Sequence, residues 1–402
     1  MNYKTYPIAD LIDEVAMGPF GSNIKVDCFV DKGIPVLNGS NLEGFELSEK
    51  SFRYVTEEKA DSLKKANAYK GDVVITHRGT LGQIVYIPQT AQRVRYVISQ
   101  SQFRVKCNKK VLPEYFVYYF HTPIGQHKLL SNASQVGVPA LARPSSTFQK
   151  IEIEIPDLET QRKVVKLIGS LQTRIKTNAE INDNLEQQAQ AYFQELFIDN
   201  ADPAWTLGTV SDLGAVVGGS TPSKAKPEYY TEDGIAWITP KDLSINKAKF
   251  VSHGENDITK LGLKNSSASI MPEGTVLFSS RAPIGYIAIA SGEVTTNQGF
   301  KSVVPKPEIG TAYVYYFLKH NLPIIEGMAS GSTFKEVSGS TMKNVPAVIP
   351  DTETLACFNG FCAPIFAQQR ILEEQNQSLT ALRDSLLPKL MSGEIDVSDI
   401  QL

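Results

Sequence analysis

The chain of 402 residues carries a formal net charge of −3 and is 42% hydrophobic, so it can bury more than one core and shows no bias towards disorder. Its four cysteines form no CxxC pair and no zinc-ligand pattern, and no stretch approaches the roughly 18 apolar residues of a spanning helix. The N-terminal residues lack an apolar signal core, and we therefore expect a cytoplasmic protein with reduced cysteines, no metal site and no membrane contact.

One ordered series of short phrases occurs twice, starting near Ile8 and again near Val210. Residues 71–82 match 274–285, and residues 155–160 match 349–354. The offset between matched residues falls only from 203 to 194 along the series, so the connecting loops differ by a few residues. A repeat of this length indicates a duplicated domain rather than a solenoid of short repeats.

Within the first copy, short segments bounded by glycine and proline predict strands at 72–75, 84–87, 103–105 and 151–155. A helix is expected from Pro113, with an aromatic face formed by Tyr115, Tyr118 and Tyr119. These tyrosines could stack on bases, but an aromatic stripe at helical spacing more often belongs to a core. Each copy therefore has a mixed α/β (α+β) character.

Each copy ends in a long periodic helix, expected at 156–198 and at 350–391. Apolar or seam residues follow one another at spacings of three and four from Ile168 to Leu196 and from Cys362 to Leu390, which is the pattern of a coiled coil. Pro156 and Pro350 stand just before or in the first turn, and Asp157 and Asp351 are expected to cap it. Asn182 and Asn376 occupy equivalent seam positions, where a polar residue sets helix register.

We expect the two helices to pair in antiparallel orientation, because a short linker leads from the first helix into the second domain and the second helix must run back. The predicted architecture is two similar domains separated by this helix pair and related by a pseudo-two-fold axis. Its segments are domain 1 at 1–155, helix 1 at 156–198, a linker at 199–206, domain 2 at 207–349, helix 2 at 350–391 and a tail at 392–402. Both chain ends are expected at domain 1.

The distribution of charge favours a nucleic-acid ligand more than the net charge does. Between Val73 and Ile151 the chain has ten Lys and Arg residues and one acidic residue, Glu114, although a solvated surface that binds nothing explains this bias equally well. Arginine, asparagine and glutamine read base edges, while serine, threonine and lysine contact phosphates. On these grounds the candidate contacts are His77, Arg78, Thr80, Arg93, Arg95, Ser99, Gln100, Gln135 and Arg143 in the first copy, and Thr239, Lys241, Ser280, Arg281, Asn297, Gln298, Ser332, Thr333 and Lys335 in the second.

No catalytic motif accompanies these residues. The sequence lacks a phosphate-binding P-loop, HExxH and GxSxG, and Asp202-Pro203-Ala204-Trp205 lacks the second proline of an adenine-methyltransferase motif. We therefore expect a binding protein rather than an enzyme. Two classes remain open: a reader of DNA, and a duplicated coiled-coil adaptor whose domains bind proteins.

The chain resembles the DNA-specificity subunits of type I restriction-modification systems. The likeness lies in the opening phrases 6–10 and 207–213, in 71–75 with 274–278, in the Ile-Pro-Asp-x-Glu-Thr leading into each helix, and in the ending 386–395. It implies two target-recognition domains that each read half of a split site in double-stranded DNA. It also implies two methyltransferase subunits that carry S-adenosylmethionine, and restriction subunits that use ATP and Mg²⁺, while this chain binds no cofactor. The acidic net charge departs from this pattern.

Overall fold

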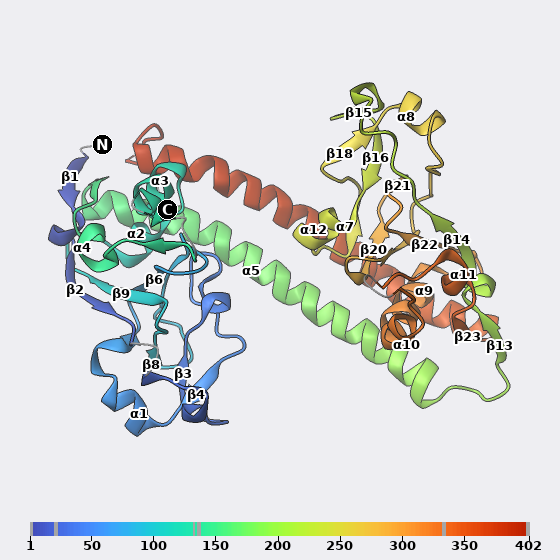
Figure 1. Ribbon diagram of the computed structural model, residues 1–402, viewed down its shortest axis with the longest axis horizontal. Coiled ribbons are helices and arrows are strands. Elements are labelled where there is room, and N and C mark those ends of the chain that lie inside the picture. Colours follow the sequence, from blue (N-terminus) through green and yellow to red (C-terminus); the bar gives the residue numbers. More distant parts are fainter. Residues whose placement is uncertain (1–2, 20–22, 132, 135–137, 332–334, 399–402) are drawn as a thin grey trace. The chain divides into compact units, whose positions relative to one another are not determined.

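A computed structural model describes residues 3–19, 23–131, 133–134, 138–331 and 335–398 of the chain. They fold into two compact units (Figure 1), unit 1 with residues 1–174 and 379–402 and unit 2 with residues 175–378. This division differs from the expected domains, because each long helix contributes one part to each unit instead of forming a body of its own.

Unit 1 is built on an antiparallel sheet with the strand order β2-β9-β6-β7, formed by Ile12–Met17, Gln102–Cys107, Asp72–Thr76 and Ile84–Tyr86. Side chains alternate between the faces of a strand. Val73 and Ile75 of β6 therefore join the core under helix α2 (Pro113–Phe120), while Val74 points into a second core. That second core is closed by the sheet β4-β3-β8-β5, formed by Arg53–Val55, Ile34–Val36, Arg95–Val97 and Asn67–Tyr69.

Unit 2 repeats this plan with one more strand in its main sheet. Its main sheet has the order β14-β22-β19-β20-β17, formed by Gly214–Gly218, Lys301–Pro305, Val276–Ser280, Ile284–Ala290 and Phe250–Val251. The second sheet is β15-β18-β16-β21, formed by Tyr230–Thr231, Asn256–Ile258, Ile235–Ile238 and Thr295–Thr296. Helix α9 (Thr311–His320) packs against β19 and β20, as α2 packs against β6 and β7.

Short elements complete both units. The strand pair β1 (Lys4–Pro7) with β12 (Glu152–Ile155) in unit 1 has its counterpart in β13 (Thr206–Thr209) with β23 (Pro346–Ile349) in unit 2. The other elements are α1 (Glu57–Ser62), α3 (Pro123–Leu130), β10 (Ala133–Ser134), β11 (Ala140–Leu141), α4 (Pro144–Phe148), α6 (Val210–Leu213), α7 (Pro240–Ile245), α8 (Lys260–Lys264), α10 (Leu322–Gly327) and α11 (Gly339–Lys343).

The local predictions for the first copy are confirmed. The four expected strands are present within two residues of their predicted ends, and α2 begins at Pro113. Tyr115, Tyr118 and Tyr119 are at most 5% exposed and belong to the main core of unit 1. Their burial excludes the alternative in which they form a stacking platform for bases.

Both long helices begin two residues after the proline that precedes them, at Leu158 for α5 (Leu158–Gln194) and at Thr352 for α12 (Thr352–Ser392). The caps are the predicted aspartates: Asp157 Oδ1 accepts from Thr160 N at 2.9 Å, and Asp351 Oδ1 accepts from Thr354 N at 2.8 Å. The hydrogen bond from Thr354 lowers the pKa of Asp351 to about 2, so this cap stays ionised above strongly acidic pH. A π-helical turn, Glu195–Asp199, continues α5 one residue beyond its predicted end.

In unit 2 the segments of α5 and α12 run in opposite directions. In unit 2, Asn182 Nδ2 donates to Gln369 O at 3.5 Å, and Asn376 Nδ2 donates to Ile175 O at 3.1 Å. Since 182 matches 376 and 175 matches 369, these two contacts are equivalent under the repeat. In unit 1, Arg383 Nη1 donates to Gln172 Oε1 at 3.1 Å. The two contacts in unit 2 pair an earlier residue of one helix with a later residue of the other, so the segments are antiparallel in that unit.

The first and last described segments meet in unit 1, in line with the expectation for the chain ends, and residues 392–398 are not a free tail. The Tyr3 hydroxyl donates to Leu390 O at 2.9 Å, and Val397 is fully buried in the core of unit 1. Lys163 of α5 also donates to Ser398 O. The segment after α12 is therefore part of the folded unit.

Candidate nucleic-acid interface

Three strand ends meet at one edge of the main sheet of unit 1. Beyond the end of β2, Gly18 N donates to Gln102 O at 2.8 Å; beyond the end of β6, His77 N donates to Ser101 O at 2.9 Å. Strand β11 joins them, since Leu141 N donates to His77 O at 2.9 Å. We call this edge, with residues 77–80, 99–102 and 139–143, rim 1.

Unit 2 brings the matching segments together in the same way. Ser280 N, at the end of β19, donates to Gly299 O at 2.7 Å, and Ser220 N donates to Thr296 O at 2.9 Å beyond the end of β14. Val337 N donates to Ser280 O at 3.0 Å, as Leu141 donates to His77 in unit 1. We call this edge, with residues 219–221, 280–282, 297–301 and 335–337, rim 2.

The close approach of the loops in both rims requires glycine at one matched position. A Cβ atom on Gly18 would lie 1.9 Å from Ser99 O, and one on Gly219 would lie 2.0 Å from Asn297 O. Any side chain would push the loop after β2 or β14 away from the polar turn beside it. The backbone frame of the two rims is therefore the same, although their side chains differ.

Rim 1 presents most of the candidate side chains of the first copy. Arg78, Thr80, Gln100 and Arg143 are exposed. His77 is half-buried with Nε2 3.2 Å from Gln100 O, and burial lowers the pKa of His77, which favours its neutral form at pH 7. Ser99 is half-buried as well, and its backbone N donates to Gln102 Oε1 at 2.9 Å.

Arg93 and Arg95 lie away from rim 1. Strand β8 begins at Arg95 and ends two residues before Ser99, so Arg95 stands at the end of the strand away from rim 1, and Arg93 precedes that end. Arg95 Nη2 is 2.7 Å from Asp61 Oδ1 of α1, and its Nε donates to Asn67 Oδ1 of β5 at 2.8 Å, so Arg95 ties α1 to the second sheet. Arg93 is exposed. A count of charges along the sequence cannot tell that Arg78 lies at rim 1 while Arg93 and Arg95 lie elsewhere.

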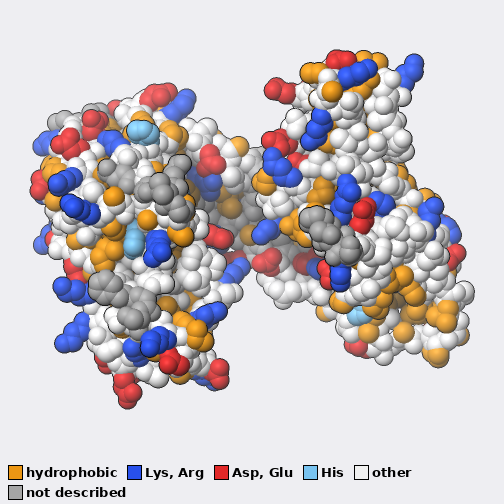
Figure 2. Space-filling view, viewed as in Figure 1, with side chains coloured by type: hydrophobic (Ala, Val, Ile, Leu, Met, Phe, Trp, Pro, Cys, Tyr) orange, Lys and Arg blue, Asp and Glu red, His pale blue; other side chains and the backbone are white. Residues whose placement is uncertain are grey.

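The basic excess of residues 73–151 is also partly internal. Arg104 is 5% exposed, and its guanidinium is 2.8 Å from Glu14 Oε1 and 3.3 Å from Asp72 Oδ2. A buried cation held by two carboxylates contributes little to an external field. Figure 2 shows Lys and Arg side chains on the visible faces of both units with Asp and Glu among them.

In rim 2 the prediction for Ser280 needs correction, because this residue is fully buried and its hydroxyl donates to Gly299 O at 3.1 Å. Asn297 is half-buried, and its Oδ1 accepts from Gly299 N at 2.8 Å, so it shapes the turn. Gln298 is exposed and its Oε1 accepts from Thr221 Oγ1. Arg281 is half-exposed and Lys335 exposed.

Two further candidates of the second copy lie at helix α7. Thr239 forms a capping box with Asp242 at the start of that helix, and its backbone N donates to Asp242 Oδ2 at 2.7 Å. Lys241 is paired with Glu255 at 2.5 Å on the surface. Thr239 therefore has a structural role, and Lys241 remains accessible. Gln135, Ser332 and Thr333 lie outside the described residues.

The seam asparagines make specific contacts across the helix pair. Besides the two backbone contacts given above, Asn376 Oδ1 accepts from Asn178 Nδ2 at 2.9 Å, and Asn178 is fully buried. Asn182 and Asn376 thus each bond to the opposite helix and not to each other. Their role in setting register stays a prediction.

Sequence reasoning missed two features of unit 2. Glu336 and Lys301 join Arg281 in an ion-paired group at rim 2, and Lys249 is 7% exposed beside Glu186 of α5. Neither carries a sequence signal, because both depend on contacts between residues distant in the chain. Lys249 looks like any other lysine of the run from Lys241 to Lys249.

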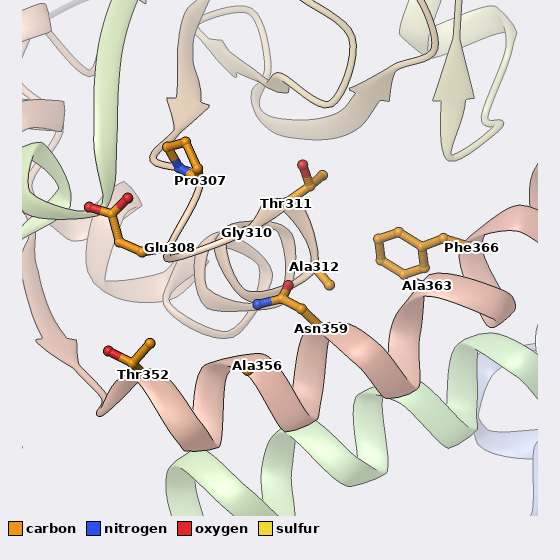
Figure 3. Close-up of a pocket in the computed structure, with 10 residues that line it drawn as sticks. All are labelled: Pro307, Glu308, Gly310, Thr311, Ala312, Thr352, Ala356, Asn359, Ala363 and Phe366. Carbon is orange, nitrogen blue, oxygen red and sulfur yellow. The ribbon is translucent and has the colours of Figure 1, made fainter.

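A cavity of about 410 Å³ lies between the start of α9 and α12 in unit 2 (Figure 3). Of its lining side chains only Glu308 is ionisable, so the cavity offers no paired acid and base. Among the described residues no three His, Cys, Asp or Glu side chains are grouped as metal ligands. Likewise, none of the helices in the described ranges combines the length and apolar character needed to cross a bilayer.

Comparison with known proteins agrees with the duplication. The family model of the type I restriction modification DNA specificity domain matches twice, at residues 14–187 and 204–381. A type I restriction enzyme MjaIX specificity subunit from Methanocaldococcus jannaschii is 43% identical over 163 residues, which span 40% of this chain and 38% of that protein. The HindI specificity subunit of Haemophilus influenzae is 24% identical over 408 residues, covering 81% of this chain and 87% of that one.

The fold has a solved counterpart. The crystal structure of a type I restriction-modification system S subunit from M. genitalium superposes with a TM-score of 0.61 at 16% identity, covering 97% of this chain and 96% of that one. The resemblance read from the repeated phrases is thus confirmed by a family match that spans most of both copies. The chain belongs to the type I restriction-modification DNA specificity family.

Proposed function

We propose that the chain is the DNA-specificity subunit of a type I restriction-modification complex, in which rim 1 and rim 2 each read one half of a split, asymmetric site in double-stranded DNA. The observation that carries this proposal is the matched backbone frame of the two rims combined with their different side chains. Two rims with similar backbones can fit DNA grooves of the same shape, and side chains that differ between the rims can select different bases.

The chemistry of the accessible side chains supports base reading in both rims. Both rims keep an arginine and a glutamine at matched positions: Arg78 and Arg281 can bond bidentately to guanine, and Gln100 and Gln298 offer amides suited to adenine. We assign the difference in the bases read to the positions where the rims differ, such as Ser99 in rim 1 and Asn297 in rim 2. For Thr80, Arg143 and Lys335 in the rims, and for Lys241 at α7, we propose phosphate contacts, which set position without carrying sequence information. Arg95, Thr239 and Ser280 are left out, because each is engaged in a structural contact.

The long helices are the proposed docking surface for two methyltransferase subunits. Helix α12 exposes the apolar side chains of Phe361, Ile371 and Leu382, and α5 exposes Ile181, each at least 40% accessible. In this proposal the chain is itself non-catalytic. S-adenosylmethionine is held by the methyltransferase subunits, and ATP and Mg²⁺ by restriction subunits where these are present.

An exchange of residues 207–349 for the matching segment of another family member tests the proposal. Methylated adenines are mapped genome-wide in cells that carry the wild-type or the exchanged chain. We expect the second half of the methylated motif to change while the first half and the spacer length stay the same. A change in both halves contradicts independent reading, and an unchanged motif contradicts the assignment of rim 2.

A DNA-binding measurement distinguishes the proposed DNA reader from the alternative, an adaptor that binds proteins. The full chain, purified with the methyltransferase subunits that co-purify from its host, is titrated with random duplex DNA at increasing salt. A DNA reader loses affinity steeply with salt because bound counterions are released. An adaptor for proteins shows no such dependence.

A further inference from the structure

Glu336 faces two cations in rim 2. Its Oε2 is 3.6 Å from Arg281 Nη1, and its Oε1 is 3.5 Å from Lys301 Nζ. The Glu336 and Arg281 side chains are each 38% exposed, while Lys301 is 16% exposed and also donates to Gln298 O at 3.3 Å. A single carboxylate thus links two cations to the turn that carries Gln298.

Rim 1 has no counterpart to this carboxylate. The hydrogen bonds from Val337 N to Ser280 O and from Leu141 N to His77 O are equivalent, so Glu336 and Ala140 occupy matching backbone positions. Ala140 is bridged to Arg78 through the backbone. Within the part of the chain that the structure describes, no carboxylate is paired with Arg78. The two rims therefore differ in charge at one matched position.

We infer that Glu336 is a positioning residue that determines specificity at rim 2, acting through Arg281 and Lys301; this rests on the proposed reading of DNA. Glu336 approaches one nitrogen of the guanidinium, and the remaining N–H donors of Arg281 stay available for the O6 and N7 atoms of a guanine. The same carboxylate repels phosphates, so it opposes non-specific binding by the two cations. Arg281 in rim 2 therefore favours base edges over phosphates, while Arg78 in rim 1 can bind either phosphates or bases.

The test uses the full chain with its co-purifying methyltransferase subunits and two substitutions, Glu336→Ala and Glu336→Gln. The wild-type complex first selects its consensus from a random duplex library. Affinity is then measured at several salt concentrations for the consensus, for a scrambled duplex and for duplexes changed at single base pairs. For both variants we expect tighter binding to the scrambled duplex and a salt slope steeper by about 1, since one more phosphate is neutralised. Discrimination at one base pair of the second half-site should fall by about fivefold or more.

Two matched variants control for charge and position. Strand register places Ser280 opposite Ile284 and Val276 opposite Ile289, so Glu293, which follows β20, stands at the end of the sheet far from rim 2. Glu293→Ala removes the same charge and should leave discrimination unchanged. Ala140→Glu adds a carboxylate beside Arg78 and should make the salt slope shallower by about 1, with effects confined to the first half-site.

The outcomes distinguish this inference from the proposed function. If the wild-type complex selects no bipartite consensus, the proposed function itself is wrong. If it selects one while both Glu336 variants keep the wild-type slope and discrimination, the role of Glu336 is overturned. Thermal unfolding followed by circular dichroism checks that each variant is folded. If Glu336→Ala does not fold, the salt slopes and discrimination of Glu336→Gln and Ala140→Glu test the role of Glu336.

Discussion

The half-buried carboxylate of Glu186 gives a quantitative prediction about stability. It lies beside Lys249, accepts from Lys319 Nζ at 2.6 Å and accepts from the Tyr316 hydroxyl at 2.9 Å. Burial by itself would raise the pKa of Glu186, but the two lysines outweigh it and lower the pKa from 4.5 to about 2. Lys249 is further held by Gln369 Oε1 at 2.7 Å and by the Phe366 ring. This group joins α5, α9 and α12 to Lys249, the residue before β17.

A folded-state pKa below the unfolded value means that the ionised carboxylate stabilises the fold at neutral pH, and that this stabilisation is lost as pH falls through the acid range. The shift from 4.5 to about 2 corresponds to about 3 kcal/mol at pH 7, at 1.36 kcal/mol per pH unit. At pH 3, where the carboxylate is mostly protonated in the unfolded chain, the same calculation leaves roughly 1 kcal/mol of this stabilisation. The substitution Glu186→Gln removes the charge and keeps the side-chain size.

We expect Glu186→Gln to lower the free energy of unfolding by about 3 kcal/mol at pH 7 and by roughly 1 kcal/mol at pH 3. Denaturant unfolding followed by tryptophan fluorescence measures this, because both tryptophans, Trp205 and Trp237, belong to unit 2. Glu180→Gln, an exposed site on the same helix, is the matched control and should change little. A loss that is equal at pH 7 and pH 3, or one as small as that of the control, would refute the reasoning.

Three other predictions concern the helix pair and rim 1. Asn376→Ala should lower the free energy of unfolding by about 1–3 kcal/mol, because buried Asn178 then loses its nearest acceptor; denaturant melts check this against exposed Gln377→Ala. Arg78→Ala should reduce discrimination at one base pair of the first half-site by about 1–3 kcal/mol in competition binding, and an equal loss in both halves would contradict separate rims. Four residues inserted into α5 add about 6 Å of helix and should lengthen the unread spacer by about one or two base pairs. An unchanged spacer in methylation mapping argues against a helix that sets distance.

The sequence predicts well wherever a local pattern is physically sufficient. The seam of α5 repeats every three or four residues, and the structure buries or half-buries its members from Ile168 to Leu196. The caps at Asp157 and Asp351 follow from the same reasoning, since a helix start must satisfy its free N–H groups within a few residues. Periodicity and capping act over one or two turns, and such effects can be read along the chain.

The sequence predicts poorly the residues that form the rims, because their neighbours lie far away in the chain. Arg78 and Arg95 are the same residue type in the same basic stretch, yet Arg78 is exposed at a strand end and Arg95 is paired with Asp61. Ser280 is fully buried, although its neighbour Arg281 is accessible. Which face of a strand meets the core, and which acid meets which base, is set by strand pairing across tens of residues.

By itself, then, the sequence determined the duplication, the periodic seam of the long helices, their caps and the family resemblance, all of which rest on spacing along the chain. Only the tertiary structure decided that α5 and α12 are shared between two units, that Lys249 is buried beside Glu186, and that Glu336 stands where rim 1 has Ala140. These features arise from contacts between segments more than 30 residues apart, as between Glu336 and Lys301, and no local periodicity encodes such contacts.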